Sequence, residues 1–166
     1  LAPPVVIDRG PYGWAAHVDR SDCADAAAVR RFYERLGGYL ALLHVLEATD
    51  MHLENVIARG EQPALIDLEA LFHPRLPVPM PPEIAASPVV RALRESVVRV
   101  GLLPAWIVRP GARNAVELSG VGGAAGQLSP DEVAVMAGVG TDEMAIVRRR
   151  VPMAGAANRP RIGGVV

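Results

Sequence analysis

Three oxygen-bearing side chains along one short stretch of the chain are typical of phosphoryl transfer. Asp50 lies in a polar segment, Asn55 follows five residues later, and Asp67 comes twelve residues further on, after an apolar run. In enzymes with this order the first Asp handles the proton of the attacking hydroxyl, while the Asn and the second Asp hold Mg²⁺ against nucleotide phosphates. This chemistry needs a positioned metal and a positioned nucleophile, so a few oxygen ligands at fixed spacing can support it.

A long helix is predicted directly before this polar segment. Between Val29 and Leu46 apolar residues recur at the three-to-four spacing of a buried helical face. They are Val29, Phe32, Leu36, Leu40, Leu43 and Leu46. Ser21 or Asp22 could cap the helix. The Gly37–Gly38 pair costs about 1 kcal/mol per glycine relative to alanine, which indicates that a neighbouring segment packs closely there.

A hairpin is predicted to bring the metal-binding candidates together. Residues 56–58 and 64–66 are apolar, and the turn-forming segment 59–63 separates them. A hairpin of this length returns its far end to the side of its start. We therefore expect Asp67 to lie next to Asn55, where both could bind one metal.

The other elements are predicted from apolar runs and from glycine and proline positions. A second helix is expected from about Ser87 to Val100. Short strands are expected at Val5–Ile7, Tyr12–Val18, Ala105–Val108, Ala115–Leu118 and Glu143–Val151. The proline-rich run from His73 to Pro82 should be a loop over the site or a crossing between elements. We expect Gly120–Gly126 to be a mobile loop, and the residues from Asn158 onward to be a tail whose partners are missing.

Composition excludes several classes of function. The net charge of −1 and the pI near 6.5 give no electrostatic basis for binding nucleic acid or an anionic membrane. No apolar run approaches the ~18–20 residues of a membrane span. A single cysteine excludes an internal disulfide framework and a cysteine zinc site, and we expect a reducing, cytoplasmic compartment.

All seventeen basic residues are arginine, and the absence of lysine bears on nucleotide binding. Protein kinases hold the nucleotide phosphates with a lysine on a strand before the catalytic loop, beneath a glycine-rich loop. Neither part occurs in this sequence. Either the lysine lies before Leu1, or the chain does not bind ATP in the usual way.

Several segments, taken in order, resemble a known family. They are Tyr12–Trp14, Thr49–Asn55, Leu65–His73, Glu95–Val97 with Gly101–Pro104, Leu118–Gly123, Gly140–Met144 and Asn158–Pro160. Together they resemble the dehydratase domain of class II lanthipeptide (lantibiotic) synthetases, the LanM type, over nearly the whole chain. The resemblance implies an α+β fold with part of a kinase-like, lipid-kinase-related catalytic core. It also implies that ATP phosphorylates Ser or Thr of a precursor peptide, and that phosphate elimination then leaves dehydroalanine or dehydrobutyrine.

The resemblance assigns roles to five side chains. Asp50 and His52 would be catalytic, Asn55 and Asp67 would bind ATP through Mg²⁺, and Glu69 would support the metal. His52 could instead be a structural histidine bonded to the backbone. The implied cofactors are ATP and Mg²⁺. The implied partner is a ribosomal precursor peptide with a leader and a core rich in Ser, Thr and Cys.

The resemblance also implies that residues 1–166 are an internal fragment of one dehydratase domain. The family's phosphate-binding lysine would precede this sequence. Its arginine and threonine for elimination, and its zinc-dependent cyclase domain, would follow. We therefore expect activity in the intact parent protein rather than in the isolated fragment.

Two other functions remain open at this stage. One is a small-molecule phosphotransferase of the aminoglycoside kind, although His52 following Asp50 argues against it. The other is an inactive pseudokinase remnant that only binds peptide. Asp142 with Glu143, and the run Arg148–Arg150, are each expected to be solvated surface rather than a metal or phosphate site. Trp14 and Trp106 are expected in the core.

Overall fold

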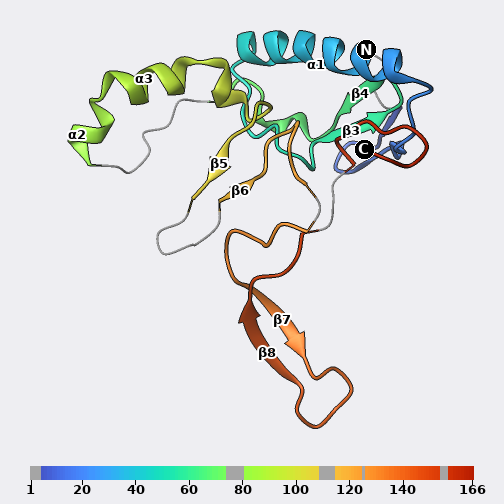
Figure 1. Ribbon diagram of the computed structural model, residues 1–166, viewed down its shortest axis with the longest axis vertical. Coiled ribbons are helices and arrows are strands. Elements are labelled where there is room, and N and C mark those ends of the chain that lie inside the picture. The colour runs from blue at the N-terminus through green and yellow to red at the C-terminus, as the bar shows by residue number, and fades with distance from the viewer. Residues whose placement is uncertain (1–4, 74–80, 109–114, 125, 154–156) are drawn as a thin grey trace.

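The computed structural model describes residues 5–73, 81–108, 115–124, 126–153 and 157–166. Helices and two-stranded antiparallel sheets alternate along it (Figure 1). In chain order the elements are β1 (Val6–Asp8), β2 (Gly13–Ala15), α1 (Ala26–Val45), β3 (Val56–Arg59), β4 (Gln62–Leu65), η1 (Leu68–Ala70), α2 (Pro82–Ala85), α3 (Pro88–Glu95), η2 (Val97–Val100), β5 (Trp106–Ile107), β6 (Val116–Glu117), β7 (Val133–Ala137) and β8 (Ala145–Arg149). No helix within these ranges combines the length and the apolar character that a membrane span requires.

The long helix α1 confirms the predicted apolar face. Phe32, Leu36 and Leu43 are buried. The helix begins at Ala26, and its N-cap is Asp25, whose carboxylate accepts a hydrogen bond from the Ala28 N–H at 2.7 Å. The expected cap at Ser21 or Asp22 is therefore wrong.

One apolar core lies between α1, the hairpin β3–β4 and η2. Its buried members are Phe32, Leu36, Leu43, Ala48, Met51, Val56, Ala58, Val100 and Leu102. Gly37 and Gly38 do not pack against it, because a methyl group added at either position would find no described atom within 4 Å. The close packing expected at these two glycines is wrong, since they lie on the solvent side of the helix.

The predicted hairpin forms with a tighter turn. β3 and β4 pair in the register Val56↔Leu65 to Arg59↔Gln62, so Gly60 and Glu61 alone make the connection. The shorter turn extends both strands at the closed end, while β4 ends at Leu65, one residue before the predicted end of that strand at Ile66. This open end is the one that carries Asn55 and Asp67.

The expected second helix divides into two pieces. α3 ends at Glu95, because Ser96 adopts an extended backbone and its hydroxyl accepts the Val98 N–H at 3.3 Å. The shorter helix η2 follows and ends at Gly101, whose φ of +84° lies in the left-handed region.

The expected strands form, most of them shorter than predicted, in small separate ribbons, and β7 is a further strand that was not predicted from the sequence. β1 pairs with β2, β5 with β6, and β7 with β8. The expectation that Trp14 and Trp106 lie in the core is wrong, since both are exposed. Each lies on a two-stranded ribbon whose face is not covered by another described element. Residues 74–80 of the proline-rich run lie outside the described residues.

The C-terminal segment 157–166 is not a tail without partners, contrary to expectation. The Ala58 N–H donates to Ala157 O at 2.7 Å, and the Cys23 N–H donates to Arg161 O at 2.8 Å. Asp22 binds the Arg161 guanidinium and accepts the Gly164 N–H at 2.7 Å. The Gly164 N–H and the arginine lower the pKa of Asp22. The segment thus bonds to the free edge of β3 at Ala58, beside Ser21, whose N–H donates to Ala58 O at 3.1 Å.

Candidate functional site

The polar loop after α1, residues 49–55, is attached to the core by its backbone. The Met51 N–H donates to Val100 O at 2.9 Å, and the Leu53 N–H donates to Leu118 O at 3.0 Å. Both side chains are buried, and Met51 is 0% exposed. Because apolar side chains from this loop enter the core on either side of His52, its polar residues are held at defined positions on the surface.

Asp50 combines an exposed carboxylate with a constrained backbone. Its side chain is 68% exposed, and its φ of +65° lies in the left-handed region. The Asp50 carbonyl accepts the His52 N–H at 2.8 Å and the Asn55 Nδ2–H at 2.9 Å. Asp tolerates this conformation better than most residues, and backbone strain of this kind is often found at functional sites.

His52 lies beside Asp50 and has one nitrogen occupied by the backbone. Its Nδ1 accepts the Glu54 N–H at 3.2 Å, and its Nε2 is the ring nitrogen on the side of Asp50. The Nε2 to Oδ1 distance of 3.9 Å is longer than a hydrogen bond. This backbone contact is consistent with a structural role for His52, although its partner is an N–H rather than a carbonyl.

Asn55 and Asp67 lie next to each other at the open end of the hairpin, as expected. The Ile66 N–H donates to Asn55 O at 3.0 Å, and Asp67 is the next residue. Asn55 is buried, and its amide nitrogen is used by Asp50, so its Oδ1 remains as the acceptor end. Asp67 is exposed, with a left-handed backbone at φ +56°. The hairpin therefore places the backbone of Asn55 beside Ile66, the residue directly before Asp67.

These oxygen donors fit a magnesium ion better than a metal that needs nitrogen or sulfur. Glu69, in η1, is exposed and lies two residues beyond Asp67. Among the described residues no group of three His, Cys, Asp or Glu side chains gathers to hold a metal. A site here would thus consist of Asn55 and Asp67, with Glu69 close in sequence. Mg²⁺ is commonly bound by one or two carboxylates together with water and substrate phosphates.

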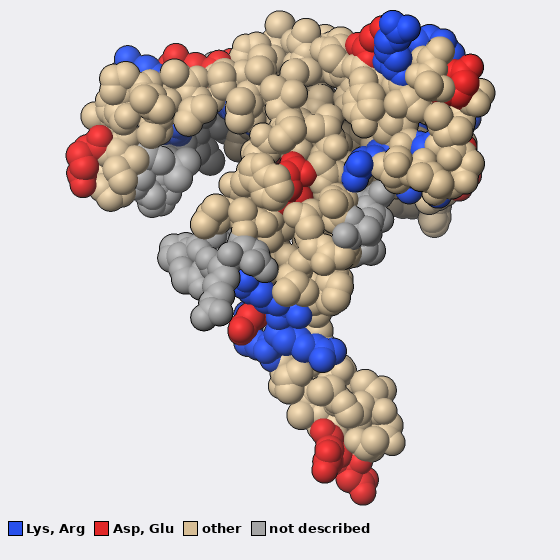
Figure 2. Space-filling view, in the orientation of Figure 1, with Lys and Arg blue, Asp and Glu red and all other residues tan. Residues whose placement is uncertain are grey.

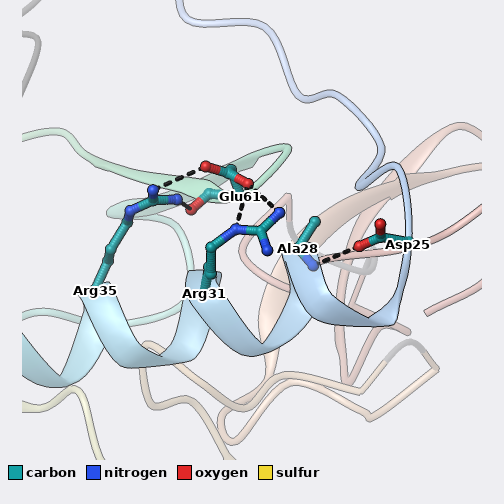
Figure 3. A network of polar contacts seen from close by, with 5 residues as sticks. All are labelled: Asp25, Ala28, Arg31, Arg35 and Glu61. Atoms are coloured by element: carbon teal, nitrogen blue, oxygen red, sulfur yellow. Dashed lines mark hydrogen bonds and ion pairs between the residues drawn. The ribbon is translucent and has the colours of Figure 1, made fainter.

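An ion-pair network fixes the hairpin turn to α1 (Figure 3). Glu61 binds Arg31 at 2.6 Å and Arg35 at 2.8 Å, and Arg35 also donates to the Glu61 carbonyl at 2.6 Å. The pKa of Glu61 is lowered, first by its hydrogen bond with Arg31 and then by that with Arg35. This network holds the closed end of the hairpin whose other end carries Asn55 and Asp67.

The glycine-rich segment beside the loop was expected to be mobile, but its described part is folded around Glu117. The buried Glu117 carboxylate accepts the Ser119 N–H at 3.0 Å and the Gly123 N–H at 2.7 Å. Gly120 and Gly123 are buried. The carboxylate supplies acceptors that a glycine turn cannot supply itself. An acidic residue at the end of a short apolar strand, before several glycines, is the signal that sequence reasoning missed.

The charged residues of the hairpin β7–β8 lie away from this site. The hairpin projects from the body of the molecule (Figure 1), with acidic groups at its tip and basic groups toward its base (Figure 2). Asp142 and Glu143 are in the connection between the strands, and Arg148 and Arg149 are in β8; all four are exposed. Their separation from the loop agrees with their expected role as solvated surface.

Comparison with known proteins adds a relative and a family. Over 98 residues, covering 59% of this chain, the sequence is 34% identical to the lacticin 481/lactococcin biosynthesis protein LcnDR2 of Lactococcus lactis subsp. lactis. The matched stretch covers 11% of that much longer protein. The family model described as "Domain of unknown function (DUF4135)" matches residues 1–166. The chain therefore belongs to the DUF4135 family.

Proposed function

We propose that this chain contributes the dehydration site of a lanthipeptide synthetase. In this proposal ATP phosphorylates Ser and Thr side chains of a ribosomal precursor peptide, and phosphate is then eliminated. The relative from Lactococcus lactis is named for the biosynthesis of lacticin 481 and lactococcin, which supports a peptide substrate. Because the match covers a small part of that protein, we assign the activity to the gene product as a whole.

The observation that supports the proposal is that hydrogen bonds connect the segments carrying Asp50, Asn55 and Asp67 at the open end of one hairpin. The side-chain amide of Asn55 donates to the backbone carbonyl of Asp50, and the backbone carbonyl of Asn55 accepts the N–H of Ile66, the residue before Asp67. Two hydrogen bonds thus connect the proton-accepting candidate to the two metal-binding candidates. Phosphoryl transfer requires these roles close together, since the nucleophile and the metal act on the same phosphate.

The first step forms one bond and breaks one. The Oγ of the substrate Ser or Thr attacks the γ-phosphorus of ATP, Asp50 accepts the hydroxyl proton, and ADP leaves. The Asp50 side chain is 68% exposed, so its carboxylate is accessible to a substrate hydroxyl. Asn55 and Asp67 would hold Mg²⁺, which supplies neutralisation of phosphate charge when bound. The His52 Nε2–H would orient the Asp50 carboxylate.

The second step removes the phosphate. A base takes the Cα proton of the phosphorylated residue, the electron pair forms the Cα–Cβ double bond, and inorganic phosphate leaves from Cβ. The sum of the two steps is loss of one water from the peptide and conversion of ATP to ADP and phosphate. A kinase-like fold of the complete domain, not of the described residues alone, is part of this proposal.

The test uses the full-length gene product with the Ser/Thr-rich peptide encoded near its gene. We expect a peptide that has lost water, formed only with ATP and Mg²⁺ and detected by mass spectrometry. Accumulation of phosphopeptide without dehydration would contradict the elimination step. Phosphorylation of an aminoglycoside but not of peptide would favour the small-molecule alternative. Peptide binding without ATP turnover would favour the inactive remnant.

A further inference from the structure

Among the described residues, Asn158 is the most buried polar side chain outside the proposed site. It is 1% exposed, although it lies in the C-terminal segment far along the chain from the loop 49–55. Its amide nitrogen donates to Gly120 O at 2.9 Å and to Gly122 O at 2.7 Å. Both N–H groups of the Asn158 side chain thus donate to carbonyls of the glycine turn, residues 118–122.

The glycine turn packs closely against the loop 49–55. A Cβ added at Gly120 would lie 2.6 Å from Met51 O and 2.5 Å from a Leu102 methyl carbon, so only glycine fits this approach. The Gly120 N–H donates to Gly101 O at 3.0 Å. The turn therefore touches the backbone of the residue that directly follows Asp50.

Two further contacts join the same turn to the loop. The Leu118 carbonyl accepts the Leu53 N–H at 3.0 Å, and His52 and Ser119 form an isolated antiparallel bridge. Any shift of the turn would accordingly be passed to the backbone on both sides of His52. Side-chain hydrogen bonds that stop such a shift act on the site without touching a substrate.

The Asn158 side chain also carries an unfavourable feature that packing alone does not explain. Its Oδ1 is buried and has no hydrogen-bond partner among the described residues. A buried polar atom left unpaired destabilises a protein, whereas an apolar side chain of similar shape would avoid that cost. The residue is therefore better explained by what its two N–H groups hold than by its own stability.

We propose that Asn158 is a positioning residue for the loop 49–55, acting through the glycine turn 118–122 on Asp50 and His52. This proposal rests on the proposed function, since Asp50 and His52 are its catalytic candidates. The residue does not contact substrate. Its role is to hold the turn so that the Asp50 carboxylate stays at one position relative to Asn55.

The test compares Asn158→Asp and Asn158→Ala with Ser129→Ala in the full-length gene product. Asn158→Asp keeps the shape and removes both donated hydrogen bonds, and Asn158→Ala does so without adding charge. Ser129 is a matched control because its buried hydroxyl also makes two hydrogen bonds, donating to Asp131 O at 2.7 Å and accepting the Val151 N–H at 3.1 Å. Neither partner belongs to the turn 118–122 or to the loop 49–55.

Hydrogen exchange of the Met51 and Leu53 amides is the primary measurement. We expect exchange at these two amides to be faster by about tenfold or more in both Asn158 variants, as loss of one to two hydrogen bonds implies, with the interior of α1 unchanged. For phosphorylation we expect kcat to fall by a similar factor while the KM for peptide changes less than about twofold. Ser129→Ala should change neither measurement.

Each other outcome has a defined meaning. Unchanged exchange at Met51 and Leu53 overturns the positioning role, whatever the activity. Faster exchange throughout α1 in both Asn158 variants also overturns it, because the residue then supports only global folding. The Asn158 variants could show faster exchange in the loop while the wild-type protein shows no ATP-dependent turnover. That result would support the positioning role of Asn158 and reject the proposed function.

Discussion

The loop 49–55 and the hairpin β7–β8 both expose charged residues, but they are stabilised in opposite ways. The loop has almost no regular structure of its own, and its backbone is bonded to Val100 and Leu118, which are distant in sequence. The hairpin has a regular five-pair ladder between neighbouring strands and projects from the body (Figure 1). Met51 in the loop is 0% exposed, whereas Met136 in the hairpin is 53% exposed.

The comparison teaches where a catalytic position comes from. A ladder between adjacent strands forms from local sequence, but it leaves the side chains free to move with the hairpin. A loop held by several distant segments has its polar groups fixed relative to one another. Positioning of this kind is what phosphoryl transfer requires, so the irregular region is the better candidate for chemistry.

The largest expected effect separates the acidic residues of the two regions. We expect Asp50→Asn to lower kcat/KM for peptide phosphorylation by about 10²–10⁴-fold, because the substrate hydroxyl loses its proton acceptor. Asp142→Asn at the tip of the hairpin should leave the rate unchanged. Equal loss in both variants would remove the distinction between the regions, as would full activity of Asp50→Asn.

The two methionines measure the difference in packing. Met51→Ala should lower the free energy of unfolding by about 2–5 kcal/mol, because it leaves a cavity in the core. Met136→Ala should change it by less than about 0.5 kcal/mol, since the side chain is already half in solvent. Urea unfolding of both variants checks this pair. Similar losses of unfolding free energy in the two variants would contradict the difference in packing between the loop and the hairpin.

Alanine substitutions at two glycines with nearly the same φ distinguish the cost of backbone strain from the cost of steric crowding. Gly101 (φ +84°) would place a Cβ 3.1 Å from Met51 N, whereas Gly140 (φ +83°), in the hairpin connection, has no described atom within 4 Å of an added Cβ. Alanine at either position costs about 1–2 kcal/mol of backbone strain. We expect Gly101→Ala to lose more stability than Gly140→Ala and also to lower activity, because it displaces the loop. Thermal unfolding and the phosphorylation rate, measured together, test this difference.

The smallest expected effect concerns pH. Because the pKa of Glu61 is lowered, its ion pairs with Arg31 and Arg35 contribute stability above the ordinary carboxyl pKa, and this contribution is lost as pH falls through the lowered value. Glu61→Gln should therefore unfold with a flatter pH profile on the acidic side than the wild type. Glu143→Gln, in the hairpin connection, should keep the wild-type profile. Chemical denaturation at several acidic pH values provides the measurement.

Sequence patterns were sufficient for elements that depend on near neighbours. The apolar spacing of α1 predicted its buried face, and the hairpin β3–β4 was predicted with the open end of its second strand one residue too late. These features follow from helical and strand periods, which are readable within a short window. The same reasoning predicted that Asn55 and Asp67 would be neighbours, because a hairpin fixes which residues face each other.

Errors occurred where distant segments decide the outcome. Trp14 and Trp106 were expected in the core on composition alone, but burial depends on whether another element covers their ribbon. The segment from Asn158 onward was expected to lack partners, yet the C-terminal segment 157–166 bonds to β3. Ser21 and Asp22 were plausible caps, but the chain before α1 is instead bonded to β3 and to the C-terminal segment.

The sequence by itself determined the order and spacing of Asp50, Asn55 and Asp67, the helix before them and the hairpin between the last two. Only the tertiary structure decided how the loop is held, through the glycine turn folded on Glu117 and the Asn158 amide that binds it. The physical reason is range. Periodicity and turn preferences act over a few residues, whereas buried hydrogen bonds between residues far apart in the chain exist only once the core has brought their segments together.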